Sequence, residues 1–134
     1  MTDPRDHKLA NILVVDDEEM NLTLLEEIFS MEGFPNVTLI DDPVTALSVF
    51  EKEPFDIILL DLKMPRMDGF EFLKQIKDKA QNPPPVLVLT ASADKETEAR
   101  VLSANAHGVI SKPFDHDNVL KTIKKLVDQH WQVA

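Results

Sequence analysis

The sequence predicts an α/β fold, with short parallel strands and helices alternating in a doubly wound sheet. Five short apolar runs, rich in β-branched residues, alternate with five segments whose apolar residues recur at helical spacing. The third run, residues 55–61, is apolar on both faces, which is typical of a parallel strand covered from both sides. Such alternation favours a parallel sheet, and right-handed crossovers restrict it to a doubly wound topology. The pattern alone does not give the strand order.

In the first half of the chain, turn residues separate the expected elements. Gly33 closes the first helix, and Pro43 stands where the second helix can begin. The expected strands are residues 11–15, 37–40 and 55–61, and the expected helices carry apolar stripes over residues 22–29 and 43–50.

The second half continues the alternation after a loop marked by Pro65 and Gly69. The run Asn82-Pro83-Pro84-Pro85 stops the third helix, and Asp94 can cap the fourth. The expected strands are residues 86–90 and 108–111, and the expected helices cover residues 70–76, 94–104 and 119–127.

Composition excludes several classes of function. The chain has 134 residues, the size of one domain, and 43% of them are hydrophobic. It has no cysteine, so thiolate metal sites are excluded, and with no signal peptide or apolar span we expect a cytoplasmic protein that makes no membrane contact. The net charge of −10 argues against direct nucleic-acid binding, which needs a basic face.

Polar residues stand directly after four of the five predicted strands. Asp16 and Asp17 follow the first strand, Asp61 ends the third, Thr90 ends the fourth and Lys112 follows the fifth. In open parallel sheets, ligands bind at the carboxyl ends of the strands. The fold is therefore expected to bring three carboxylates, one hydroxyl and one ammonium to a single edge.

This set of groups matches the needs of phosphoryl transfer. Clustered carboxylates raise one another's pKa unless a cation joins them, and oxygen ligands with space for water suit Mg²⁺. A carboxylate can attack phosphorus to give an aspartyl-phosphate, while a metal, a lysine and hydroxyl donors neutralise the phosphoryl oxygens. Asp61, Lys112 and Thr90 can fill these roles.

Each residue also has a purely structural interpretation. Asp17 can cap the first helix, Asp61 can be a turn residue and Thr90 can be an ordinary β-branched strand residue. Lys112 can be a surface charge. The functional interpretation depends on their joint placement after four strands, which capping alone does not explain.

These residues lie in motifs that resemble the receiver domain of two-component response regulators. The motifs are Ile12–Glu18 (ILVVDDE), Asp61–Gly69 (DLKMPRMDG), Thr90-Ala91 and Lys112-Pro113-Phe114. The resemblance covers residues 9–127 and implies a flavodoxin-like sheet in the order 2-1-3-4-5. Residues 1–8 are then a polar N-terminal arm, and residues 128–134 extend the last helix or begin a linker.

The resemblance implies a role for each site residue. Asp61 would accept a phosphoryl group from a sensor histidine kinase or a histidine phosphotransfer domain. Asp17, Asp61 and the backbone carbonyl of Lys63 would ligate Mg²⁺ directly, with Asp16 acting largely through water.

The phosphoryl oxygens would be bound by other groups. Thr90 and Lys112 would contribute side chains, while Lys63 and Ala91 would contribute backbone N–H groups. The Lys112–Pro113 bond would be cis. Such a domain is no conventional enzyme, because it only phosphorylates and dephosphorylates itself.

The expected partner downstream is an output domain or a target protein. Val109 stands where receivers carry an aromatic switch residue, three positions before Lys112. An aspartate-nucleophile phosphohydrolase is disfavoured, because Lys63 stands where such enzymes need a second acid. A phosphate-independent interaction module remains the alternative.

The apolar stripe of the last helix continues beyond residue 127 to Trp131. Two interpretations stay open: this Trp folds back on its own domain, or it marks a linker stub or the seam of a homodimer.

Overall fold

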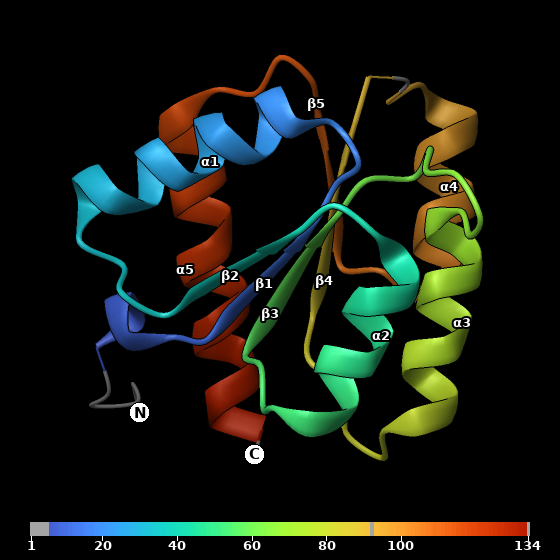
Figure 1. The fold of residues 1–134 in the computed structure, drawn as a ribbon, viewed down its shortest axis with the longest axis horizontal. Coiled ribbons are helices and arrows are strands. Elements are labelled where there is room, and N and C mark those ends of the chain that lie inside the picture. Colours follow the sequence, from blue (N-terminus) through green and yellow to red (C-terminus); the bar gives the residue numbers. More distant parts are fainter. Residues whose placement is uncertain (1–5, 92, 134) are drawn as a thin grey trace.

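The structure is a parallel sheet with helices on both faces (Figure 1). The computed structural model describes residues 6–91 and 93–133. The strands lie in the order β2-β1-β3-β4-β5 and all neighbours pair in parallel, so the predicted topology is confirmed. The elements in chain order are η1 (His7–Leu9), β1 (Ile12–Val15), α1 (Glu19–Glu32), β2 (Val37–Ile40), α2 (Pro43–Lys52), β3 (Ile57–Leu60), α3 (Gly69–Lys79), β4 (Val86–Thr90), α4 (Lys95–Ser103), β5 (Gly108–Ser111) and α5 (His116–Val133).

Side-chain caps set where three of the helices begin. Asp42, Asp68 and Asp94 precede α2, α3 and α4, and each carboxylate accepts a hydrogen bond from the backbone N–H three residues further on. α1 ends at Gly33, whose φ of 79° places it in the left-handed region that glycine adopts without strain. The predicted cap at Asp94 and helix end at Gly33 are both confirmed.

The sheet separates two hydrophobic clusters. α1 and α5 cover one face, and α2, α3 and α4 cover the other (Figure 1). Along β3, Ile57 and Leu59 join the first cluster while Ile58 and Leu60 join the second. All four side chains are fully buried, which confirms the two-sided burial predicted for this strand.

Trp131 belongs to the core of its own domain. Its side chain is only 7% exposed, and its Nε1 donates to Oδ1 of Asp56 over 2.9 Å. The second Asp56 oxygen accepts from the backbone N–H of Asn11 at 2.8 Å. The ring of His7 stacks on Trp131, with 5.7 Å between centroids. Of the two interpretations, the structure supports the Trp that folds back.

The last residues of the predicted N-terminal arm begin a short helix. His7–Leu9 form the short helix η1, opened by the Asp6 carboxylate, which accepts from the N–H of Lys8. The stack on Trp131 explains why this polar segment is ordered, and sequence periodicity cannot reveal such a contact. Residues 1–5 of the predicted arm, and residue 134 of the predicted extension, lie outside the described residues.

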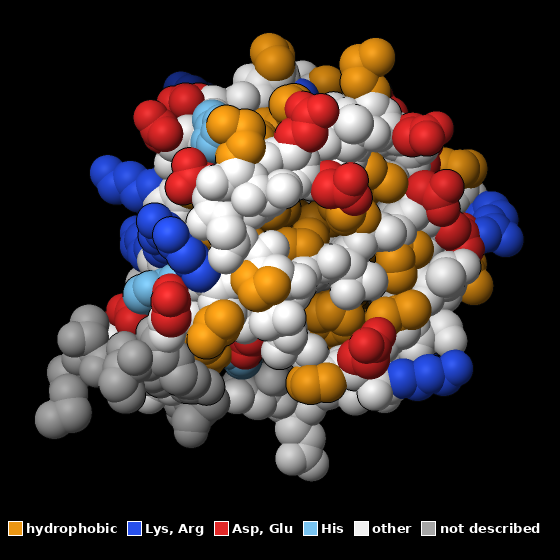
Figure 2. All heavy atoms as spheres, turned by 60° about the vertical axis from the view of Figure 1, so that its left-hand side comes forward, with side chains coloured by type: hydrophobic (Ala, Val, Ile, Leu, Met, Phe, Trp, Pro, Cys, Tyr) orange, Lys and Arg blue, Asp and Glu red, His pale blue; other side chains and the backbone are white. Residues whose placement is uncertain are grey.

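The surface of α1 is partly apolar. Among the described residues, six large hydrophobic side chains are exposed, and three of these lie on α1: Met20, Leu24 and Met31. Figure 2 turns this side of the molecule forward and shows hydrophobic side chains interspersed with carboxylates. None of the described helices is long and apolar enough to span a bilayer.

Replacing Trp131 tests the tie between α5 and the sheet. Trp131→Phe keeps the aromatic body but leaves Oδ1 of Asp56 without its indole donor, so we expect a loss of about 1–3 kcal/mol in the free energy of unfolding. Urea denaturation followed by circular dichroism measures the loss. Leu102→Ala, at an exposed residue of α4, is the control and should change stability by less than about 0.5 kcal/mol. Equal stability of the two variants would show that the indole bond contributes nothing.

Candidate functional site

The residues predicted from the strand ends do converge on one edge of the sheet. Asp16, Asp61 and Thr90 are the buried polar or charged residues among the described part of the chain, with 2%, 5% and 1% of their surface exposed. They follow or end β1, β3 and β4. Lys112 follows β5, and its side chain is 10% exposed. The edge therefore holds a largely buried group of opposite charges.

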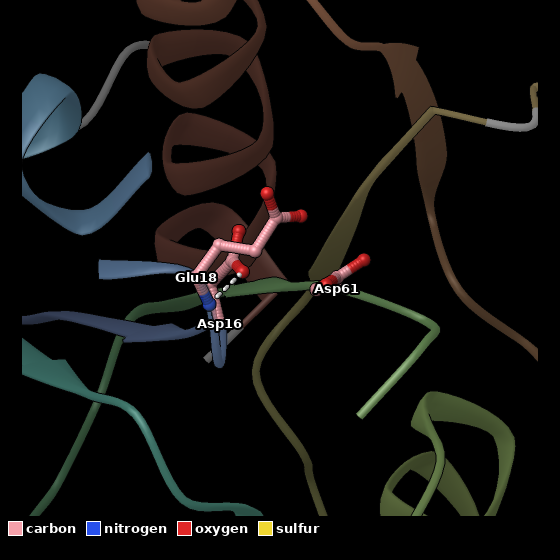
Figure 3. A group of neighbouring side chains, drawn as sticks. All are labelled: Asp16, Glu18 and Asp61. Atoms are coloured by element: carbon pink, nitrogen blue, oxygen red, sulfur yellow. Dashed lines mark hydrogen bonds between the residues drawn. The ribbon is translucent and has the colours of Figure 1, made fainter. Parts of the chain in front are cut away.

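The Lys112 ammonium is the centre of this group. Its Nζ lies 2.9 Å from Oδ2 of Asp16 and 3.6 Å from both Oδ2 of Asp61 and Oε1 of Glu18. The three acids also lie close to one another, with one carboxylate oxygen of each within 4.8 Å of the others. Figure 3 shows Asp16 and Glu18 side by side on the loop after β1, with Asp61 reaching in from the end of β3. Three carboxylates thus surround one ammonium.

This excess of carboxylates changes the acidity of Asp61. Burial and the neighbouring Asp16 charge together raise the pKa of its carboxyl to about 6, against the opposing effect of Lys112. Burial disfavours the ammonium of Lys112, but the hydrogen bond with Asp16 and the neighbouring carboxylates outweigh burial and raise its pKa above the ordinary value. Lys112 is therefore charged at neutral pH, and the pKa of Asp61 lies closer to neutral pH than that of an ordinary aspartate.

Backbone hydrogen bonds fix the positions of these side chains. The N–H of Asp61 donates to the carbonyl of Val15 at 3.0 Å, which aligns the ends of β3 and β1. The N–H of Lys112 donates to the carbonyl of Thr90 at 2.8 Å, which aligns β5 with β4. The Lys112–Pro113 bond is cis, as the resemblance implied.

Gly69 lets the first turn of α3 pack directly on the site. Its N–H donates to the carbonyl of Leu62 at 2.8 Å. A Cβ at this position would lie 2.8 Å from both the backbone oxygen of Asp61 and the Cα of Leu62, so no other residue fits without moving the backbone. The loop after Asp61 is thus held against α3.

The same loop is also tied to α2. Arg66 has a φ of 70°, uncommon for a residue with a side chain, and forms an ion pair with Asp42. The hydroxyl of Thr45 and the guanidinium of Arg66 lower the pKa of Asp42 to about 2. Two helices therefore hold the loop that carries Lys63.

The remaining predicted residues lie around this centre. Asp17 is exposed and lines a cavity beside the site together with Lys63 and Thr90. The backbone N–H of Lys63 makes a long contact of 3.5 Å with Oδ1 of Asp61. Ala91 is exposed directly after β4. The sequence analysis expected these residues at this edge, and the structure brings them there.

Glu18 is the member of the acid group that the sequence analysis did not assign. Its backbone N–H donates to Oδ1 of Asp16 at 2.9 Å, and its carboxylate then lies near Lys112. The available signal was its place two residues after Asp16. Val109, at the expected switch position, is half-buried and packs against the cluster of α2, α3 and α4.

The donor set suits a hard divalent cation. Asp16, Glu18 and Asp61 offer carboxylate oxygens, the ligand type that Mg²⁺ prefers, within 4.8 Å of one another. A bound cation would offset the burial and the Asp16 charge, which together raise the pKa of Asp61. The residues present therefore fit a magnesium site.

The chain is similar to known proteins over most of its length. The model of the response regulator receiver domain matches residues 12–124. The chain is 37% identical to response regulator RR06 of Streptococcus pneumoniae, over 92% of this chain and 55% of that protein. It is 32% identical to the chemotaxis protein CheY-3 of Vibrio cholerae, over 92% of this chain and 95% of that protein. The chain thus spans about half of the first relative and nearly all of the second.

Solved structures show the same fold. A CheY-like receiver domain from Methanospirillum hungatei has a TM-score of 0.84 at 30% identity, covering 94% of this chain and 99% of that one. The receiver domain of sensor histidine kinase PA1611 from Pseudomonas aeruginosa has a TM-score of 0.79 at 26% identity, covering 89% and 98%. In that structure a magnesium ion is coordinated in the active-site cleft.

The raised pKa of Asp61 predicts a pH-dependent cost to stability. Because the folded-state pKa of about 6 exceeds the ordinary value of 3.8, ionisation is harder in the folded protein. The cost is absent below about pH 4, grows as the pH rises through 6 and is complete above it. Without metal, Asp61→Asn should therefore be more stable than the wild type by about 1–3 kcal/mol at pH 7, since one pKa unit equals about 1.4 kcal/mol.

The measurement is chemical denaturation in EDTA from pH 4 to pH 8. The gain should shrink towards zero at pH 4. Asp78→Asn, which removes an exposed carboxylate from α3, is the charge-matched control and should show no such pH dependence. A constant difference across the range would mean that Asp61 does not titrate as the geometry requires.

Proposed function

This chain belongs to the family of response regulator receiver domains, and we propose that it works as the phosphoacceptor of a two-component or phosphorelay pathway. The phosphoryl group goes onto Asp61. The observation that carries the proposal is the placement of this buried carboxylate 3.6 Å from the Lys112 ammonium, at the edge where parallel sheets bind ligands.

The proposed step is a transfer between two nucleophiles. An oxygen of Asp61 forms a bond to phosphorus as the P–N bond of a phosphohistidine breaks, and the bonding pair returns to the imidazole nitrogen. Lys112 and Thr90 then offset the charge on the phosphoryl oxygens, and the backbone N–H groups of Lys63 and Ala91 donate to them. Hydrolysis later removes the phosphoryl group: a water oxygen bonds to phosphorus, the bond to Asp61 breaks, and inorganic phosphate leaves the regenerated carboxylate.

Magnesium is the proposed cofactor. Asp16, Asp17, Asp61 and the backbone carbonyl of Lys63 are the proposed ligands. The acid group supports Asp16 and Asp61, and Asp17 and Lys63 line the cavity beside them. When bound, Mg²⁺ supplies positive charge to the transferring phosphoryl group. The magnesium in the cleft of the PA1611 receiver supports the same assignment here.

Phosphorylation would then act as a switch. It adds roughly −1.5 to −2 charges and three acceptor oxygens at the end of β3, which attract Thr90 and Lys112. The rearranged surface meets an output domain or a separate target protein. We propose residues 9–127 as the unit that switches, with residues 128–134 extending α5.

The exposed apolar side of α1 is the proposed contact for the phosphodonor protein. Glu18 precedes α1 and belongs to the acid group, so the first turns of this helix border the site. Met20 and Leu24 are 82% and 43% exposed there. A histidine-bearing domain that covers them brings its imidazole to Asp61.

Intact mass after incubation with Mg²⁺ and a small phosphodonor tests the acceptor. We expect one phosphoryl adduct on the wild type, none without Mg²⁺ and none on Asp61→Asn, because the amide is no nucleophile. An absent adduct, or one that persists in Asp61→Asn, would contradict the assignment and favour a phosphate-independent interaction module.

Leu24→Glu tests the docking side. It places a charge in the apolar contact, so transfer from a phosphorylated histidine phosphotransfer domain that serves the wild type should slow at least roughly tenfold, as about 1.4 kcal/mol of lost contact implies. Labelling by a small donor should stay within about twofold, since it needs no docking. Leu102→Glu, an equally exposed leucine on α4, is the matched control and should transfer normally. If Leu24→Glu and Leu102→Glu slowed transfer equally, α1 would not be the specific contact for the donor protein.

A further inference from the structure

The cavity beside the acid group forms a recess between the loop after β3 and α4. Its volume is about 470 Å³, large enough for a small organic anion. Asp17, Lys63 and Thr90 line it on the side of the strand ends, and Phe70, Thr97 and Arg100 line it from α3 and α4. Asp68, which caps α3, also lines it. The N–H of Lys63 contacts the Asp61 carboxylate, so the recess borders the proposed acceptor.

Arg100 lines the recess from α4 and contacts an aromatic ring of α3. Its guanidinium carbon lies 4.3 Å from the centre of the Phe70 ring, a cation–π contact between α4 and α3. Among residues 6–91 and 93–133 no carboxylate lies within ion-pair distance of this guanidinium. The planar guanidinium matches the two oxygens of a carboxylate.

We propose that this recess binds the carboxylate leaving group of a small acyl phosphate, and that Arg100 selects donors of this class. The inference deepens the proposed function and rests on it. In the step, an oxygen of Asp61 bonds to phosphorus, the bond between phosphorus and the acyl oxygen breaks, and the carboxylate leaves with the bonding pair. No proton moves, and one acyl phosphate is exchanged for another.

The chemistry of the leaving group explains the selectivity. A carboxylate leaving group gains negative charge on two oxygens as the bond breaks, so a guanidinium that donates to both binds it more tightly in the transition state than in the donor. Phosphoramidate releases neutral ammonia, which has no oxygen to accept these hydrogen bonds. Arg100 therefore accelerates transfer from the first class of donor and not from the second.

The experiment compares acetyl phosphate with phosphoramidate as donors to Asp61, by intact mass in the presence of Mg²⁺. Arg100→Ala should lower kcat/KM for acetyl phosphate about five- to tenfold and leave phosphoramidate within about twofold. Arg100→Lys should recover part of the rate. Lys95→Ala removes one positive charge from the same helix outside the recess and should change neither rate. The proposal would be overturned if Arg100→Ala lost rate equally with both donors or lost none. It would also be overturned if Lys95→Ala showed the same loss of rate with acetyl phosphate.

A second measurement needs no transfer. The Phe70 ring current should shift the Arg100 Hε resonance upfield, and acetylphosphonate, which cannot transfer its phosphorus, should move this signal in both the wild type and Asp61→Asn. An unmoved signal would overturn the site. If neither donor phosphorylates the wild type, the proposed acceptor function is refuted instead. The response of the Arg100 Hε signal to acetylphosphonate would still test the recess.

Discussion

The contact between the Lys112 ammonium and the carboxylates of Asp16 and Asp61 is the interaction on which the site depends. Both carboxylates are almost fully buried, and a buried charge without a partner costs several kcal/mol. Lys112 follows the edge strand β5 and reaches past β4 to groups that follow β3 and β1. The strand order, the alignment of β5 on β4 and the length of the lysine side chain are therefore all needed to keep the edge folded.

The Lys112 ammonium compensates the buried negative charge at this edge only in part, and this affects the stability of the folded protein. Burial and the Asp16 charge raise the pKa of Asp61, and the Lys112 ammonium offsets them only in part. The ionised Asp61 therefore makes the folded protein less stable at neutral pH than an uncharged residue would. A cation that binds here would stabilise the ionised carboxylate, so the cost to stability and the affinity for a divalent ion have the same origin.

The sequence predicts those parts of the site that parallel-sheet geometry determines. Side chains directly after strands must meet at one edge, so the chain positions of Asp16, Asp61, Thr90 and Lys112 are enough to assign them to the site. Glu18 could not be assigned in this way, because a residue before a helix can direct a long side chain either to solvent or to the site. The apolar stripe of the last helix pointed to Trp131, but its stack with His7 joins distant parts of the chain, and no local period records such a contact.

The helices around the site are not equally anchored. α4 buries only Val101, whereas α1 and α2 bury three residues each and α3 buries four. Apart from that side chain, the Arg100–Phe70 contact joins α4 to α3, and exposed cation–π contacts contribute only about 0.5–1 kcal/mol. α4 follows Thr90, so a displacement at this end of β4 meets the least resistance along α4. A displaced α4 would lose the Arg100–Phe70 contact, and both of these residues line the recess.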